Sequence, residues 1–399
     1  MKILIISQYF YPENFRINDL VFSLMKKKHN IEVLTGKPNY PKGFYFKEYS
    51  WKKPSLEHIN NIPIHRANLF LRGRGGGIRL FLNYISFIFF GYFKLLKLKG
   101  PFDKVFIYAP SPITVGFLGI IAANKFNCKS YLWIHDLWPE SVKVAGGINN
   151  KFILSMIDQM TRFIYKKTDI LLVQSPFFKK YLEKQKVDLK KVVYYPYYAE
   201  AFYKPVTSSV EVKNKFPKGF NILFAGNIGT AQSFDTIVEA IDLIKKEQIN
   251  IVVLGDGRDK ERLQEKIKTL GLSHKFYFLG SHPPENMPEY FAAADALLIT
   301  LKKADIFSYT IPGKLQSYLA CGKPIIGALD GIGKQIIEVS NSGLCVDAED
   351  VVGLSENIIK MNKIPPNELL TFGNNGLDYF NNHFNKEKLL NDFEAILKG

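Results

Sequence analysis

The chain is short of cysteine. Its 399 residues include only three, Cys128, Cys321 and Cys345, which lie far apart and form no pairing pattern. This usage is typical of a reducing compartment and excludes a metal site built from cysteines. We therefore expect a cytoplasmic protein.

Targeting signals and long apolar runs are also missing. The first apolar run, KILII, is interrupted by Ser7 and Gln8 and has no small-residue cleavage site after it. We expect a buried first strand there and no signal peptide. Elsewhere, an uncharged stretch covers residues 80–93, which is shorter than the roughly 20 residues that cross a bilayer.

Cations flank that stretch on both sides: Arg72, Arg74, Arg79, Lys94, Lys97 and Lys99. Two interpretations remain open for residues 72–99. One is an ordinary buried helix of the first sheet. The other is a cationic, aromatic-rich helix that lies in the membrane interface.

Acidic residues are scarce in the first half of the chain. The formal charge is +16, but residues 1–200 carry 31 Lys and Arg against 13 Asp and Glu, and the remainder is close to neutral. Such a one-sided basic surface predicts a polyanionic partner: nucleic acid, anionic lipid or a phosphorylated substrate. No nucleic-acid motif occurs and the aromatic residues cluster with apolar runs, so we expect no nucleic acid, although a basic nucleic-acid-binding protein remains the non-enzymatic alternative.

What is present is a regular alternation of apolar strands and helices. Hydrophobic residues make up 47% of the chain, and its length favours two domains. The expected strands are 2–7, 31–36, 102–109, 129–136 and 170–175 in the first half, and 220–227, 249–257, 275–281, 294–300 and 323–329 in the second. Continuous apolar strands separated by helices predict two doubly wound parallel sheets in tandem. The Tyr- and Pro-containing stretch 194–205 is the expected linker.

Glycine turns follow two strands of the second half. Gly226 and Gly229 come between a strand and a helix, and the sequence LGDGRDK places Gly255, Gly257 and Arg258 after the next strand. Backbone N–H groups at such turns can approach a phosphate at a helix N-terminus. Neither turn completes GxGxxG with a later acidic residue, which argues against a dinucleotide oxidoreductase.

A third motif is YTIPGKLQSYLACGKPIIG at 309–327. It predicts a helix from about 314 to 320, with Lys314 in its first turn. A cation is unfavourable beside the positive end of a helix, unless an anion also binds there. Lys314 is therefore either a solvent-facing lysine or part of an anion site.

Together, the segments SQYFYPENFRINDL, HDLWPES, AGNIG, GDG and PGKLQSYLACGKP resemble glycosyltransferase family 4. More narrowly, they are similar to the bacterial N-acetyl-L-fucosamine transferases of O-antigen and capsule assembly. The resemblance implies a GT-B fold, in which two Rossmann-like domains face a central cleft, and a retaining reaction without a metal ion or other cofactor. It also implies an acceptor domain at 1–200, a nucleotide-sugar domain at 201–384 and a C-terminal helix at 385–399 that returns to the first domain.

The resemblance implies donor-binding residues but with departures. The family's arginine and lysine of the phosphate turn are Asn227 and Gln232 here, and its two glutamates are Tyr309 and Ser317. We therefore expect Arg258 and Lys314 to balance the diphosphate charge. The full expected donor set is Gly226, Asn227, Gly229, Arg258, Gly280, Ser281, Lys314, Gln316 and Ser317.

In the first half, HDLWPE follows a strand and supplies His135 and Asp136, which we expect to orient the donor sugar and to bind hydroxyl groups. Asn14, Arg16, Trp138 and Glu140 are the expected acceptor contacts. The substrates implied are a UDP-sugar and a polyprenyl-diphosphate-linked glycan at the inner face of the cytoplasmic membrane, whose anionic surface the protein contacts peripherally. A nucleotide-sugar 2-epimerase of the same fold is the alternative enzyme.

Overall fold

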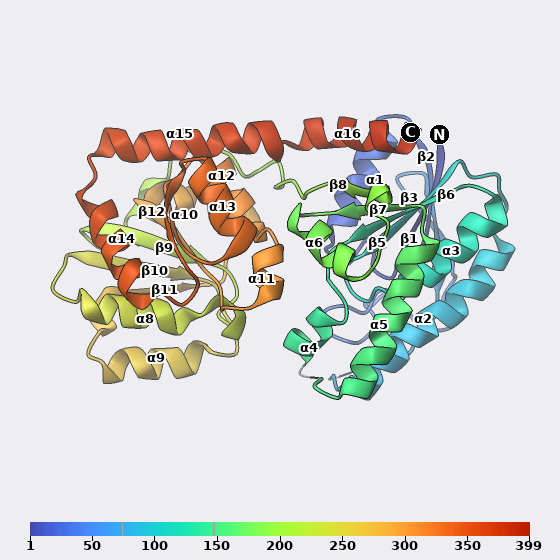
Figure 1. Cartoon of the computed structure of the whole chain (residues 1–399), viewed down its shortest axis with the longest axis horizontal. Coiled ribbons are helices and arrows are strands. Elements are labelled where there is room, and N and C mark those ends of the chain that lie inside the picture. The colour runs from blue at the N-terminus through green and yellow to red at the C-terminus, as the bar shows by residue number, and fades with distance from the viewer. Residues whose placement is uncertain (74, 147) are drawn as a thin grey trace. The chain divides into compact units, whose positions relative to one another are not determined.

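Two parallel-sheet units follow one another in the computed structural model, which describes residues 1–73, 75–146 and 148–399. The first unit comprises residues 1–195 together with 390–399, and the second comprises 196–389. Figure 1 shows both, coloured along the chain. Arg74, one of the expected flanking cations, lies outside the described residues.

The first unit is built on an eight-stranded sheet in the order β3-β4-β2-β1-β5-β6-β7-β8. Its strands are β1 (Lys2–Ser7), β2 (Asn30–Gly36), β3 (Leu56–Ile59), β4 (Ile62–Ala67), β5 (Lys104–Ala109), β6 (Lys129–Ile134), β7 (Ile170–Val173) and β8 (Val192–Tyr194). The central strand β1 pairs in parallel with β2 and β5, and its residues Ile3 to Ile6 are fully buried. Such continuous burial is expected for a strand covered on both faces.

This sheet corrects the sequence prediction at its edges. The expected parallel strands are present, but β3, β4 and β8 were not predicted, and β3 runs antiparallel to β4. The sheet is therefore mixed. Strands β3 and β8 are short, partly exposed strands at the two edges of the sheet, and Pro63, His65 and Arg66 interrupt β4, so none of the three shows the apolar run that identified the central strands.

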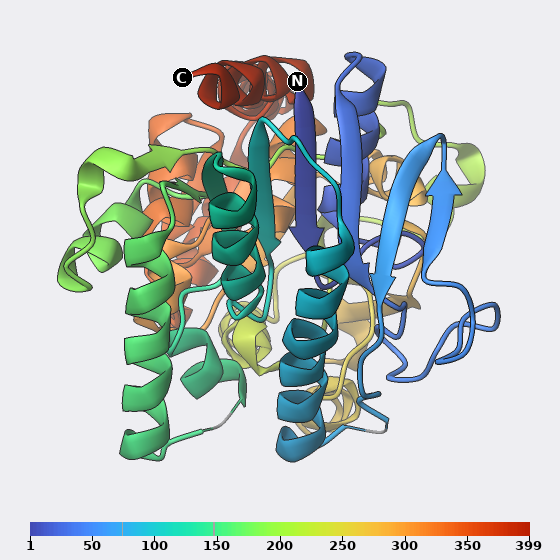
Figure 2. The same ribbon diagram turned by 90° about the vertical axis from the view of Figure 1, so that its right-hand side faces the viewer.

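Helices cover both faces of the first sheet: α1 (Arg16–Lys26), α2 (Gly77–Lys97), α3 (Val115–Phe126), α4 (Glu140–Gly146), α5 (Lys151–Lys167) and α6 (Phe177–Lys184). The connections through α1 and α2 cross the sheet in opposite directions, and right-handed crossovers therefore place these helices on opposite faces. Figure 2 shows α2, α3 and α5 side by side on the face turned to the viewer.

Helix α2 is apolar on its outer side. Asn83, Ser86 and Phe87 are buried, whereas Ile78, Phe81 and other large apolar side chains are exposed. Among the described residues it is the one helix whose length and composition suit a membrane span, and 28% of that window is buried. Helix α2 packs on β2, β4 and α3, so it covers one face of the sheet. It is longer than the uncharged stretch 80–93 from which its length was judged.

The second unit has a parallel six-stranded sheet in the order β11-β10-β9-β12-β13-β14. Its strands are β9 (Phe220–Ala225), β10 (Ile249–Leu254), β11 (Phe276–Gly280), β12 (Ala296–Thr300), β13 (Ile325–Ala328) and β14 (Gly343–Val346), the last of which was not predicted. Its helices are α7 (Val210–Lys213), α8 (Phe234–Leu243), α9 (Lys260–Thr269), α10 (Met287–Ala293), α11 (Asp305–Tyr309), α12 (Gly313–Ala320), α13 (Gly331–Val339), α14 (Val351–Lys363) and α15 (Pro366–His383).

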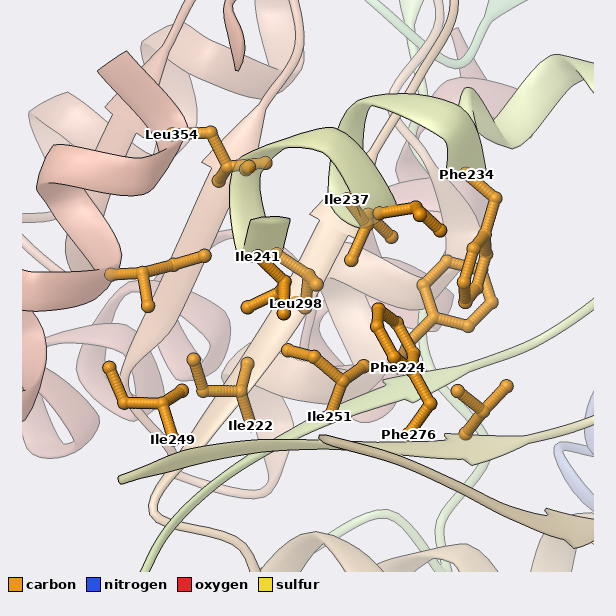
Figure 3. Packing of buried hydrophobic residues seen from close by; sticks show 14 of the residues in the cluster. Ile222, Phe224, Phe234, Ile237, Ile241, Ile249, Ile251, Phe276, Leu298 and Leu354 are labelled. Atoms are coloured by element: carbon orange, nitrogen blue, oxygen red, sulfur yellow. The ribbon is translucent and has the colours of Figure 1, made fainter. Parts of the chain in front are cut away.

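The core of the second unit lies where α8 meets this sheet. Ile237 and Ile241 of α8 face Ile222, Ile251 and Leu298 of the strands, all at most 1% exposed (Figure 3). These side chains recur every three or four residues on α8 and every two residues on the strands, which is the pattern that buries one face of each element. The core therefore fixes the ends of β9 and β10, which carry the glycine turns.

The last helix, α16 (Lys386–Lys398), completes the first unit from Leu390 onward. The buried ring of Phe393 packs edge-on against Phe106 at 4.9 Å between centroids, and it also meets Tyr195 at 5.3 Å. Glu394 accepts from Lys27 at 2.8 Å and contacts His29 at 2.7 Å. A segment distant in sequence thus supplies part of the first core.

Candidate functional site

The ends of β9, β10 and β11 converge in the second unit through two glycines. Gly226 donates its N–H to Leu254 O, and Gly255 donates to Gly280 O at 2.8 Å. A Cβ on Gly255 would lie 1.9 Å from Gly226 O, and one on Gly257 would lie 2.1 Å from Ile228 O. Only glycine permits this close approach, so the turns that the sequence singled out form one continuous edge.

Lys314 projects over this edge from the first turn of α12. Its Nζ donates to Gln232 Oε1 at 2.5 Å and lies 3.9 Å from the centroid of the Phe224 ring. A Cβ on Gly226 would lie 3.2 Å from the same nitrogen. Burial lowers the pKa of Lys314 to about 7. The structure thus brings together a lysine, a neutral partner and an exposed glycine turn, an arrangement suited to an anion.

Arg258 is exposed and reaches the same loop. It donates to Thr230 Oγ1 at 3.0 Å, and Thr230 opens the short 3₁₀ turn Thr230–Gln232 that ends at the partner of Lys314. Asn227 is exposed, and its amide nitrogen would lie 2.7 Å from a Cβ on Gly229, so Gly229 leaves room for that side chain. Asn227 and Gly229 thus lie in the loop after β9, and Arg258, which follows β10, contacts that loop.

Gly280 and Ser281 end β11 beside open space. Gly280 has a φ of +78°, and a Cβ there would meet nothing within 4 Å. Ser281 is exposed. Both residues of the predicted donor set therefore lie at a strand end on the same sheet edge as the glycine turns.

Gln316 and Ser317 point elsewhere. Gln316 is fully buried and its amide donates to Tyr197 O at 2.7 Å, while the Ser317 hydroxyl donates back to Gly313 O at 3.4 Å. The structure therefore corrects the expectation for Gln316, whose side chain holds residue 197 within the second unit. Ser317 is 8% exposed and bonds its own helix.

In the first unit, His135 follows β6 and is packed among aromatic rings. Its ring centroid lies 4.4 Å from that of Tyr108 and 4.6 Å from that of Trp133. Burial and the nearby charge of Arg16 hold the pKa of His135 well below its usual value, so the imidazole is neutral near pH 7. Because His135 also fills the core, an alanine there would open a cavity and reduce stability.

Asp136 is the next residue, and burial raises its pKa to about 6. Trp138 is buried, and its carbonyl accepts from the Tyr181 hydroxyl at 3.0 Å. Glu140 begins α4 and is half-buried. A carboxylate with a raised pKa at a strand end is a marker of functional sites.

Asn14 lies in the loop after β1 and Arg16 follows at the start of α1, but the loop is organised by a residue that the sequence did not single out. Glu13 is 1% exposed, and its Oε1 accepts from the backbone N–H of Asn39 at 2.9 Å and of Tyr40 at 2.8 Å. Burial raises the pKa of Glu13 to about 7. Asn14 beside it is exposed, and Arg16 starts α1.

A second missed group surrounds Arg72. Its guanidinium lies over the rings of Tyr9, Tyr40 and Tyr84, at 5.2, 5.5 and 5.4 Å from their centroids. It also donates to Asn83 Oδ1 at 3.2 Å. Such cation–π contacts hold a cation among aromatic faces that can also stack on a sugar. The abundance of tyrosine near residue 10 was the available signal, but the group comes from three segments.

Acidic and metal-ligating residues are dispersed. Within residues 1–73, 75–146 and 148–399 no group of three or more His, Cys, Asp or Glu side chains is placed to hold a metal ion.

Comparison with known proteins shows that the chain is similar to glycosyltransferases. Residues 207–378 match the family described as glycosyl transferases group 1. The chain is 22% identical over its full length to the colanic acid biosynthesis glycosyl transferase WcaI of Escherichia coli (strain K12), which it also covers completely.

Solved structures give the same fold. Sucrose-phosphate synthase from Thermosynechococcus elongatus superposes with a TM-score of 0.73 at 17% identity, covering all of this chain and 98% of that one. Anabaena Alr3699/HepE in complex with UDP has a TM-score of 0.70 at 14% identity, with both chains fully covered. By its matched second unit, its full-length relative and its two parallel-sheet domains, this chain is a glycosyltransferase of the GT-B fold.

Proposed function

We propose that this protein transfers a sugar from a UDP-sugar to a polyprenyl-diphosphate-linked glycan, with retention of configuration, during assembly of a capsule or O-antigen polysaccharide. The proposed sugar is N-acetyl-L-fucosamine or a related amino sugar. The observation that carries the donor assignment is Lys314, a lysine of lowered pKa that faces the glycine turn with a neutral partner. A nucleoside diphosphate would supply the missing negative charge. The UDP bound to the HepE neighbour and the colanic acid assignment of WcaI support the proposal.

The proposed reaction forms a bond from the acceptor hydroxyl oxygen to the anomeric carbon while the bond from that carbon to the diphosphate breaks. The hydroxyl proton passes to the departing phosphate. Lys314 and Arg258 stabilise the charge that develops on the diphosphate, which is where a preorganised cation lowers a barrier most. His135 and Asp136 orient the donor sugar. No metal ion takes part in the proposed reaction, so the activity should survive a chelator.

The acceptor side of the proposal rests on the first unit. We place the lipid-linked glycan near Asn14, Arg16, Trp138 and Glu140, with the enzyme bound peripherally to the inner face of the cytoplasmic membrane. Two helices support docking there, because each exposes apolar side chains near its start: Phe81 (61%) on α2, and Phe152 (73%) with Met156 (58%) on α5. Figure 2 shows both helices starting at the same end of the unit.

A panel of UDP- and dTDP-sugars, offered with a lipid-diphosphate-sugar acceptor and followed by mass spectrometry, tests the proposal. We expect one UDP-amino sugar to extend the acceptor, with and without EDTA. Conversion of the donor sugar without an acceptor would instead indicate the 2-epimerase. Failure of every UDP-sugar, with transfer from a dTDP-sugar, would overturn the base assignment.

A further inference from the structure

A basic pocket in the first unit takes no part in the reaction proposed above. It has a volume of about 260 Å³ and lies between the end of β4, the segment 50–55 and the second half of α2. Five of its lining residues are cations and none is a carboxylate: Lys37, Lys53, Arg66, Lys94 and Lys97. A concentration of one sign of charge in a concave site attracts an anion.

Of the two inner cations, Lys37 is held by neutral groups and Arg66 by a carboxylate. Lys37 Nζ donates to the carbonyl oxygens of Ser50 at 2.6 Å, Trp51 at 3.0 Å and Lys53 at 3.0 Å. Arg66 is paired with Glu57 at 2.6 Å, just outside the lining. The contacts of Lys37 use its three N–H groups but leave its charge without a counter-ion.

The outer lysines add to this unbalanced charge. Lys94 Nζ donates to the Ser55 hydroxyl, a neutral partner. Its pKa is lowered by burial and by the charge of Lys97, and the pKa of Lys37 is lowered by burial and by Lys94. Each positive charge therefore disfavours protonation of the neighbouring lysine, and a bound anion would offset the repulsion among Lys37, Lys94 and Lys97.

The rim of the pocket is aromatic and exposed. Phe93 is 48% exposed and Trp51 is 42% exposed, and the Trp51 ring stacks on Phe70 at 5.9 Å. Phe93 also belongs to an exposed apolar stripe along α2, formed with Ile78, Phe81, Ile85 and Phe89. Exposed aromatic side chains beside cations are typical of residues at the level of lipid headgroups. A soluble phosphate would gain nothing from this rim.

We propose that the pocket binds the phosphate of an anionic membrane lipid, whose acyl chain lies along the exposed stripe of α2. This rests on the membrane docking in the proposed function and deepens it, because it replaces general attraction to a charged surface with one headgroup site.

Flotation with phosphatidylglycerol-containing and pure phosphatidylcholine vesicles tests the proposal. The pocket variant carries Lys94→Gln and Lys97→Gln. The matched control carries Lys26→Gln and Lys28→Gln, which remove two exposed cations at the end of α1, on the opposite face of the sheet. Since each cation at an anionic surface contributes about fivefold to binding, the pocket variant should bind anionic vesicles about tenfold or more weakly, and the control should match wild type. Equal losses in both variants would overturn the proposal.

The source of the phosphate is tested with glycerol 3-phosphate in solution, followed by NMR titration. Binding in solution as tight as binding to vesicle lipid would assign the pocket to a soluble phosphate and overturn the lipid assignment. Lys97→Glu, at an exposed position, provides a second variant if the double variant misfolds. UDP binding, measured in every variant, should be unchanged; absence of UDP binding even in wild type would contradict the proposed function and leave the vesicle result intact.

Discussion

The ammonium of Lys314 lies 2.5 Å from the amide oxygen of Gln232, a neutral partner that does not balance its charge. Because burial lowers the pKa of Lys314 to about 7, most of the population is deprotonated at pH 8. Binding of a diphosphate should raise that pKa and take up a proton. Titration calorimetry of UDP at pH 8, in buffers of different ionisation enthalpy, should therefore detect proton uptake in wild type and none in Lys314→Met.

The same variant separates binding from stability. In the unfolded chain a lysine has its ordinary pKa of 10.5, so the unfolded state binds more protons between about pH 7 and 10, and folding stability should rise with pH in that range. Lys314→Met should flatten that rise. Turnover should fall by ~2–4 kcal/mol of transition-state stabilisation. Arg258→Ala, at the exposed contact with Thr230, should lower turnover less. Wild-type turnover in both variants would show that neither Lys314 nor Arg258 stabilises the departing diphosphate.

Asp136 gives the second prediction. Its pKa of about 6 in the fold, against 3.8 in the unfolded chain, means that the folded state binds more protons between these values. Stability should therefore fall as pH rises from about 4 to 6, and Asp136→Asn should be more stable than wild type at pH 8 by about 1–3 kcal/mol. If the ionised carboxylate binds hydroxyl groups, the same variant loses transfer activity.

Denaturant unfolding at pH 4 and pH 8, with transfer assays, measures both effects. Asp158→Asn, which breaks a partly exposed pair with Arg162 on α5, is the control and should change stability by less than about 1 kcal/mol. Full transfer activity in Asp136→Asn would show that the Asp136 carboxylate is not needed for the reaction.

Helix α2 gives the third prediction. Phe89 is 56% exposed and Phe87 is fully buried, although the two are neighbours in the same uncharged run. Phe89→Ser should reduce binding to vesicles with little change in melting temperature, because more than half of the Phe89 side chain is exposed to solvent. Phe87→Ser should destabilise the fold by about 3–5 kcal/mol. The reverse pattern in vesicle sedimentation and thermal unfolding would place the docking surface elsewhere.

The fourth prediction concerns α16. Phe393→Ala should destabilise the first unit by about 3–5 kcal/mol, because the ring fills a space between Phe106 and Tyr195. Glu394→Ala should cost about 1 kcal/mol or less, since its ion pair with Lys27 is partly exposed. Urea unfolding followed by tryptophan fluorescence measures both, because the three tryptophans, Trp51, Trp133 and Trp138, all lie in the first unit. Leu370→Ala, at an exposed position on α15, is the control.

The central strands and the glycine turns could be predicted from sequence because each depends on residues close together in the chain. The apolar runs around Ile5 and Val252 and the turn at Gly226 are local signals. Strand β4 was missed because Pro63, His65 and Arg66 interrupt its apolar pattern.

Side-chain direction could not be predicted. Gln316 stands in the most informative motif, yet its amide turns to Tyr197 O. Helix α12 is buried at every residue from Leu315 to Ala320, so its spacing does not show which neighbour each side chain meets. The three tyrosines around Arg72 come from separate segments, so no spacing reveals them. The exposure of Phe89 could not be predicted from sequence either, because a fully buried helix can have the same amino-acid composition as α2.

The return of α16 to the first unit has a consequence for synthesis on the ribosome. Domains generally fold in the order in which they emerge, the N-terminal one first. Here the core around Phe106 lacks Phe393 until the entire second unit has been translated. The second unit can therefore reach its final packing before the first, whose apolar surface around Phe106 stays uncovered until the last helix has been synthesised.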